Sequence, residues 1–223
     1  MTEDKPIAKP IIDDVTREKM ALMFSGEVYL PDDVDGFFDL QAAQRDLQLE
    51  LNATPLTNPK RRTELMQAFF GAAGEGLYLE CPVYANWGCN TYWGERCYAN
   101  FNLTLVDDGE IFIGSHTMIG PNVTLVATGH PVRPDLRYQG AQYSLPVHIG
   151  ENVWIGANVT VLPGVTIGDN AVIGANSLVT KDIPANTVAY GSPCKVIREI
   201  NERDDVYYWR DRQFSERFKL KEQ

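Results

Sequence analysis

Residues 127–147 contain the side chain best suited to acid–base chemistry. The segment reads Ala127-TGHPVRPDLRYQGAQYSLP, holds three prolines and has no internal repeat, although the chain on both sides of it is repetitive. A loop of this length inside a regular structure is usually functional or disordered. Its single imidazole, His130, lies between Gly129 and Pro131 near the start of the loop. A neutral histidine can accept the proton of an attacking hydroxyl group, so we predict that His130 is a general base.

The remaining histidines and the cysteines offer less chemistry. His116 and His148 lie within or beside repeats, 14 and 18 residues from His130, and we expect them to point outward as surface or interface residues. Cys81, Cys89, Cys97 and Cys194 include no C-x-x-C pair, so we expect thiols rather than disulfides or metal ligands. We therefore predict no metal site.

The charge balance argues against several classes of partner. The 223 residues include 30 acids and 20 bases, which gives a net charge of −10 and a pI near 4.8. Such a chain is not expected to bind nucleic acid or an anionic membrane. No apolar run approaches the roughly 20 residues that span a bilayer, and Met1-TEDK lacks the order of a signal peptide. We expect a soluble, cytoplasmic protein.

The charges also divide the chain into three regions. Residues 1–75 hold 14 acids and 8 bases, residues 76–193 hold 9 and 4, and residues 194–223 hold 7 and 8. We predict an N-terminal helical region over 1–75, a charge-poor repetitive β structure over 76–193 and a C-terminal tail over 194–223. Helices are expected at 16–24, at 40–52 and after Asn58-Pro59, where the apolar spacing and the stop signals fit.

A six-residue repeat defines the middle region. It reads Ile149-GENVW, Ile155-GANVT, Val161-LPGVT, Ile167-GDNAV, Ile173-GANSL and Val179-TKDIP, and the same phase occurs upstream at Ile113, Ile119 and Leu125. A looser register, Cys81, Trp87, Trp93, Ala99 and Leu105, precedes it and is offset by two residues across 107–110. We expect these residues, Cys81 included, to point into the core.

Each repeat can form one short strand and one sharp corner, so that three repeats close a triangular coil. A second inward position carries small residues: Val153, Val159, Val165, Ala171 and Ser177. The corner position carries residues that tolerate positive φ: Asn152, Asn158, Gly164, Asn170 and Asn176. The pattern resembles the hexapeptide-repeat left-handed parallel β-helix, and the resemblance supplies the handedness. The same fold hosts zinc-dependent carbonic anhydrases, but the spacing of the histidines here differs from theirs.

Longer stretches carry a more specific resemblance, over roughly residues 20–205. Tyr98-ANFNLTLVDDG, Ile119-GPNVTLVATGHPV and the run from Ile149-GENVW to Pro193-CKVIREI are similar to the galactoside and maltose O-acetyltransferases, as is Met23-FSGEVY. The resemblance implies transfer of acetyl from acetyl-coenzyme A to a sugar hydroxyl. It also implies a homotrimer with active sites between adjacent β-helices.

The resemblance assigns the site residues. His130 is the general base, and Asp32, Asn100 and Asp108 contact the acceptor, with Asp33 as the alternative to Asp32. Asn86 stands where the galactoside enzymes have serine, and asparagine can still donate and accept hydrogen bonds. Gln142 and Tyr143 are further candidates from their position in the loop.

The resemblance also implies a donor site. Coenzyme A is expected to contact backbone groups at Ala157 and Ala175, then Thr180 and Lys181, then Lys195 and Arg198, while Trp154 forms a wall. The positive charges of Lys181, Lys195 and Arg198 suit coenzyme A, which is a long anionic ligand. The implied mechanism is direct transfer in a ternary complex, with a backbone N–H near Ala157 stabilising the oxyanion.

Two other functions stay open. The acceptor could be an antibiotic, an amino sugar or serine in place of a sugar such as galactoside, maltose or glucose. Alternatively, the chain could be a non-catalytic trimeric scaffold, although the intact T-G-H-P segment argues against a decayed site.

Overall fold

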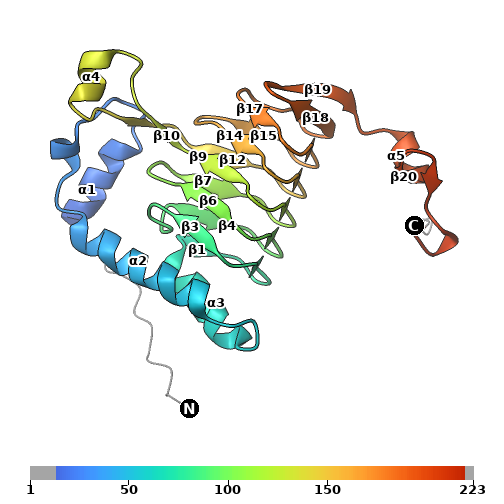
Figure 1. The fold of residues 1–223 in the computed structure, drawn as a ribbon, viewed down its shortest axis with the longest axis horizontal. Coiled ribbons are helices and arrows are strands. Elements are labelled where there is room, and N and C mark those ends of the chain that lie inside the picture. Colours follow the sequence, from blue (N-terminus) through green and yellow to red (C-terminus); the bar gives the residue numbers. More distant parts are fainter. Residues whose placement is uncertain (1–13, 219–223) are drawn as a thin grey trace.

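The computed structural model describes residues 14–218 and consists of a β-helix with helices at one end and a tail at the other (Figure 1). Residues 1–13 and 219–223, which belong to the predicted N-terminal region and tail, lie outside the described residues. None of the helices between Asp14 and Phe218 is long and apolar enough to cross a membrane. Whether the three predicted regions are separate domains stays a prediction.

Three parallel sheets form the faces of a triangular prism. The first sheet contains β1 (Ala72–Ala73), β4 (Thr91–Trp93), β7 (Ile111–Ile113), β12 (Val147–Ile149) and β15 (Thr166–Ile167). The second contains β2 (Tyr78–Leu79), β5 (Tyr98–Ala99), β8 (Met118–Ile119), β13 (Trp154–Ile155), β16 (Val172–Ile173) and β18 (Thr187–Gly191), and β19 (Cys194–Glu199) closes it in antiparallel orientation. The third contains β3 (Val83–Ala85), β6 (Leu103–Val106), β9 (Thr124–Val126), β14 (Thr160–Val161) and β17 (Leu178–Val179). The predicted mainly β, parallel β-helix is confirmed.

The interior of the prism is a ladder of aliphatic side chains. Ile113 pairs with Ile149, and Val161 pairs with Val179, so equivalent repeats stack in register. The predicted small inward residues are all buried: Val153, Val159, Val165, Ala171 and Ser177. The predicted corner residues all have positive φ: Asn152, Asn158, Gly164, Asn170 and Asn176. The side chains of Asn152, Asn170 and Asn186 also bond to one another along that corner.

The expected register is wrong in the first coil. Ala85 pairs with Leu105, and Leu79 pairs with Ala99, so Leu79 and Ala85 point into the prism. Cys81 is only half-buried, at a corner. Trp87 is buried outside the prism, in a cluster with Met23 and Phe37. The reason is a wider turn after β3, which shifts the repeat by two residues just as the turn after β6 does.

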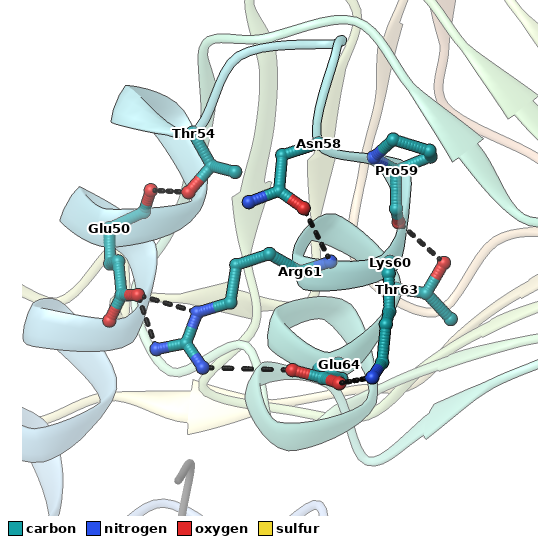
Figure 2. Close-up of polar contacts among 8 residues, drawn as sticks. All are labelled: Glu50, Thr54, Asn58, Pro59, Lys60, Arg61, Thr63 and Glu64. Carbon is teal, nitrogen blue, oxygen red and sulfur yellow. Dashed lines mark hydrogen bonds and ion pairs between the residues drawn. The ribbon is translucent and has the colours of Figure 1, made fainter. Parts of the chain in front are cut away.

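Two of the predicted helices, α2 (Phe38–Ala53) and α3 (Pro59–Phe69), cover the N-terminal end of the prism. The first, α1 (Asp14–Met23), packs against the turn after β3, and a short 3-10 turn, η1 (Pro31–Val34), lies between α1 and α2. The side chain of Asn58 accepts a hydrogen bond from the backbone N–H of Arg61, and Pro59 follows at the first helical position, so α3 begins where the sequence predicts (Figure 2). Arg61 also bonds through Nε to Glu50 of α2 at 2.8 Å, which fixes the two helices together (Figure 2).

Side chains of α2 and α3 cover the exposed strand edges at this end. The amide of Asn52 accepts from the N–H of Val83 at 2.9 Å and donates to its carbonyl at 2.8 Å, as a neighbouring strand would. Gln48 accepts from the N–H of Ala85 at 2.7 Å, and Arg62 donates to the carbonyl of Leu79 at 2.6 Å. Unpaired strand edges invite association with other chains, so these bonds close the sheets as well as capping the core.

Two segments leave the prism. The predicted loop, 127–147, contains β10 (Thr128–Gly129), α4 (Pro134–Tyr138) and β11 (Tyr143–Ser144), and Figure 1 shows it reaching toward the N-terminal helices. After β19, the tail forms α5 (Glu202–Val206), a hairpin of β20 (Tyr207–Trp209) and β21 (Arg212–Gln213), and a 3-10 turn, η2 (Glu216–Phe218). In Figure 1 this tail stands away from the coils.

Replacing Asn52 by alanine should destabilise the fold. The change leaves the N–H and C=O of Val83 without their partners, and we expect a loss of about 2 kcal/mol in the free energy of unfolding. The measurement is urea denaturation at fixed protein concentration. Arg45→Ala, at an exposed position of the same helix, is the control and should change stability by less than about 0.5 kcal/mol. Equal effects of the two changes would contradict the proposed role of Asn52.

Candidate active site

One edge of the prism collects several predicted site residues. Asn86 and Asp108 follow β3 and β6, and His130 follows β10, at the start of the loop that continues from β9. Strands β3, β6 and β9 pair in register in the third sheet. Residues after these strands therefore stack along the edge between the third and first sheets, which we call the His130 edge. Asn86 is exposed, and Asp108 is half-buried.

Hydrogen bonds connect the first two of these residues. Nδ2 of Asn86 donates to Oδ2 of Asp108 at 2.7 Å, and Nε1 of Trp87 donates to Oδ1 of the same carboxylate at 3.3 Å. Both carboxylate oxygens retain lone pairs for a further donor, such as a hydroxyl group. The pair of Asn86 and Asp108 can thus hold a polyhydroxylated ligand.

His130 has a defined tautomer. Its side chain is exposed, and Nδ1 lies 2.8 Å from the carbonyl oxygen of Ala141. A carbonyl oxygen only accepts, so Nδ1 carries the proton and donates it in this bond. In the neutral imidazole, Nε2 is then the basic nitrogen and is able to take a proton from a ligand. Ala141 is completely buried, so its carbonyl gives the ring a rigid support.

A pocket of about 330 Å³ lies beside this edge. Asp108, Trp87 and Gln142 line it from the β-helix and its loop, and Tyr29 and Asp35 line it from the N-terminal segment. Backbone hydrogen bonds in both directions between Tyr29 and Gln142, at 2.9 and 3.0 Å, hold the two walls together. Contact of Gln142 with an acceptor stays a prediction, and His130 itself is not among the residues that line this pocket.

The N-terminal aspartates take different places. Asp32 is exposed on η1 and does not line the pocket, and Asp33 accepts a hydrogen bond from the N–H of Leu30, which caps that turn. The aspartate that lines the pocket is Asp35, which sequence reasoning missed. Nζ of Lys19 lies 2.5 Å from its Oδ1, and this bond lowers the pKa of Asp35. Contact of Asp32 with an acceptor stays a prediction.

A second group of predicted residues lies along a different edge. Asn100, Ala157 and Ala175 follow strands of the second sheet, at its edge with the third, which we call the Asn100 edge. With Trp154 and Arg198 they line a groove of about 900 Å³ along the outer face of that sheet. Tyr208 and Trp209 of the tail line the same groove.

Three predicted donor residues do not line this groove. Thr180 and Lys181 follow β17, so they belong to the His130 edge, nearer the C-terminal end of the prism. Lys195 lies on β19, opposite Tyr190, and is exposed. Within one chain, the residues predicted for a single active site are therefore divided between two edges.

The other two histidines lie apart from the pocket. His116 occupies a corner with φ of 63°, and His148 is exposed on the first sheet, stacked on Phe112 with ring centroids 4.9 Å apart. Between residues 14 and 218, no three His, Cys, Asp or Glu side chains are grouped as metal ligands would be. No disulfide joins the four cysteines, all of which lie in this range.

The most buried titratable group is one that sequence reasoning missed. The carboxylate of Asp107 is completely buried and accepts hydrogen bonds from the backbone N–H groups of Trp87 and Gly88, at 2.8 and 2.7 Å, and from the hydroxyl of Thr91 at 3.0 Å. Burial raises the pKa of Asp107 to about 7, although these donors act in the opposite direction. The resemblance assigns a role to the neighbouring Asp108 but none to Asp107, and no motif in the sequence indicates a role for Asp107.

Comparison with known proteins identifies the family. The model of the bacterial transferase hexapeptide (six repeats) matches residues 146–181, and that of the maltose acetyltransferase hexapeptide capping motif matches residues 22–74. A galactoside O-acetyltransferase of Lactococcus lactis subsp. lactis (strain IL1403) is 53% identical over 183 residues, which cover 82% of this chain and 88% of that protein.

Comparison with solved structures gives the same family. A galactoside acetyltransferase in complex with coenzyme A matches with a TM-score of 0.84 and 46% identity, over 88% of this chain and 98% of that one. A maltose O-acetyltransferase from Clostridium difficile 630 matches with a TM-score of 0.79 and 39% identity, over 82% and 98%. The chain therefore belongs to the galactoside and maltose O-acetyltransferase family of hexapeptide-repeat transferases. The predicted family, class of enzyme and left-handed β-helix are confirmed.

The raised pKa of Asp107 makes a prediction about stability. Because burial raises it from 3.8 to about 7, the folded chain binds this proton more tightly than the unfolded chain does. The stability that protonation of Asp107 contributes to the folded state is fully present below about pH 4 and is lost as the pH rises through 7. Asp107→Asn cannot titrate in this range, so the substitution should lower the melting temperature more at about pH 5 than at about pH 8. Thermal denaturation at both values tests this, and the opposite order would contradict it.

Proposed function

We propose that the chain transfers an acetyl group from acetyl-coenzyme A to a hydroxyl group of a sugar of the galactoside, maltose or glucose type. The observation that carries this proposal is the orientation of His130, whose Nδ1 is bonded to the buried carbonyl of Ala141, which leaves Nε2 as the basic nitrogen. The next residue of the same loop, Gln142, lines the pocket with Asp108. The coenzyme A bound in the matching galactoside acetyltransferase supports the donor.

The proposed chemistry is direct transfer between two bound substrates. Nε2 of His130 takes the proton of the acceptor hydroxyl, and the oxygen attacks the thioester carbonyl. The tetrahedral intermediate collapses as the carbon–sulfur bond breaks, and the imidazolium returns its proton to the thiolate of coenzyme A. No covalent bond to the protein forms in this sequence.

Backbone amides support the donor side of the proposal. Gly156 and Asn158 donate their N–H groups to the carbonyls of Ile173 and Pro121, but among the described residues the N–H of Ala157, between them, has no acceptor. The same holds for Ala175, between Gly174 and Asn176. An amide that faces a groove without a partner can bind an amide carbonyl of the donor or stabilise an oxyanion.

The division of the site between two edges supports a homotrimer. We propose that the His130 edge of one copy faces the Asn100 edge of the next, so that His130, Thr180 and Lys181 meet Asn100 and Ala157 of a neighbouring copy across the interface. A cyclic arrangement closes after three copies and gives three equivalent sites. Cations at Lys181, Lys195 and Arg198 would then flank one donor.

His130→Ala should reduce turnover by roughly 100-fold or more, because that is the usual contribution of a general base. Binding of coenzyme A, measured by calorimetry, should stay within about twofold of the wild type, since the imidazole contacts the acceptor. His148→Ala is the control, because it removes an exposed imidazole from the first sheet, away from the pocket. Wild-type turnover in His130→Ala would exclude this residue as the base.

Mixed oligomers test the shared site. His130→Ala and Asn100→Ala should each lose most activity alone. Co-expression should restore activity, because about a quarter of the sites in randomly mixed trimers combine an intact His130 from one copy with an intact Asn100 from the next. Activity no higher than that of either variant alone would show that one chain supplies both residues or that the copies do not associate.

The acceptor is tested by a panel. Thiol release from acetyl-coenzyme A is measured with galactosides, maltose, glucose and amino sugars, and with serine and an aminoglycoside as acceptors of other classes. We expect the highest kcat/KM with a neutral sugar, because Asn86, Asp108 and Gln142 offer hydrogen bonds suited to hydroxyl groups. A preference for serine or the antibiotic would overturn the acceptor class, and failure to bind coenzyme A would indicate a scaffold.

A further inference from the structure

Two coils at the N-terminal end of the prism are longer than the others. Ala85 pairs with Leu105, and Leu105 pairs with Leu125, which is twenty residues per coil, whereas Val161 pairs with Val179, eighteen residues further on. The additional residues lie in the turns after β3 and β6, which are both on the His130 edge. These wider turns carry Asn86 and Asp108, so the extra length and the proposed acceptor site coincide.

Asp107 joins the two turns. It is the first residue after β6, yet its carboxylate accepts from the N–H groups of Trp87 and Gly88 and from the hydroxyl of Thr91, all of which belong to the preceding turn and strand. Nδ2 of Asn90 donates to its backbone carbonyl at 2.8 Å. The carboxylate is fully buried, so it has no solvent contact and cannot touch a ligand in the pocket.

The backbone that Asp107 holds carries Trp87, which lines the pocket, and Asn86, which is bonded to the pocket residue Asp108. Fixing the N–H groups of Trp87 and Gly88 sets the directions of the Asn86 and Trp87 side chains, which both donate to Asp108. The indole of Trp87 also packs edge-on against Phe37, with ring centroids 5.3 Å apart, and so joins the N-terminal segment to the edge. The two adjacent aspartates thus have different roles, since Asp107 holds the backbone and Asp108 faces the pocket.

We infer that Asp107 is a positioning residue for acceptor recognition, which holds Asn86 and Trp87 in place against Asp108 without touching either substrate. The inference rests on the proposed function for the identity of the acceptor. It assigns the effect of Asp107 to acceptor binding and not to donor binding, because the groove along the second sheet contains none of the residues that it holds.

Kinetics of three variants test the inference. Asp107→Asn keeps the shape but replaces an acceptor oxygen with a donor, and it should raise the KM for the acceptor about tenfold or more while the KM for acetyl-coenzyme A stays within about twofold. Thr91→Val removes one of the three donors and should raise the acceptor KM about threefold. Thr117→Val is the matched control. Thr117 is also completely buried and hydrogen-bonded, but it precedes β8, at the corner between the first and second sheets and away from the turns that Asp107 joins. The control should lower the melting temperature about as much as Thr91→Val and leave both KM values unchanged.

A second readout needs no substrate and remains informative if Asp107→Asn is unstable. Trp87 is buried, so acrylamide should quench its fluorescence weakly in the wild type. The emission of Trp87 is isolated by subtracting the spectrum of the same protein with Trp87→Phe. Its quenching should increase in Asp107→Asn and in Thr91→Val but not in Thr117→Val. Unchanged quenching in both variants would overturn the inference. Increased quenching with an unchanged acceptor KM would also overturn it. If the wild type acetylates no sugar, the proposed function fails, whereas increased quenching still supports the positioning of Trp87.

Discussion

The whole structure depends on the in-register stacking of coils around a narrow prism, whose interior from β7 onward is filled by small and aliphatic side chains. Each strand from β1 to β17 has only two to four residues, so its hydrogen bonds hold only while the next coil has a matching strand directly above it. The completely buried Ile155, Val159 and Val161 show how little room the interior leaves. A repeat can therefore vary in length only at its corners, and chemistry can occur only there or on the outer faces.

This constraint explains the location of the site. The loop at 127–147 and the two widened turns all interrupt the same edge, and the strands on either side of them stay paired. The bond from Nδ1 of His130 to Ala141 connects the start of the loop to its far side, so the loop supports its own imidazole. The bonds between Tyr29 and Gln142 then attach the N-terminal segment to it. A rigid coil thus positions a pocket formed from irregular segments.

The fold was predictable because its pattern is local. A six-residue period and corner asparagines specify every coil from 147 onward, and Asn58-Pro59 specifies the start of α3. The first coil was not predictable in the same way, because Trp87 has the apolar character of a core residue and packs against Phe37 outside the prism. Likewise, the resemblance selects Asp108 for the acceptor but assigns nothing to Asp107, since the bonds that hold Asp107 join residues of consecutive coils. Asp35 was missed because its place in the pocket depends on how the 3-10 turn folds against the loop.

The proposed donor site shows how an acidic protein can bind a polyanion. A net charge of −10 repels coenzyme A at long range, but salt screens that field within about 8 Å at physiological ionic strength. Short-range contacts then determine the affinity, and the proposed contacts are backbone amides at Ala157 and Ala175 with a few cations. One of those cations is already paired, because Arg198 makes two bonds to Asp204 of the tail, at 2.6 and 2.7 Å. A phosphate that binds Arg198 through the same nitrogens must displace that carboxylate, so the tail and the donor compete for one guanidinium group.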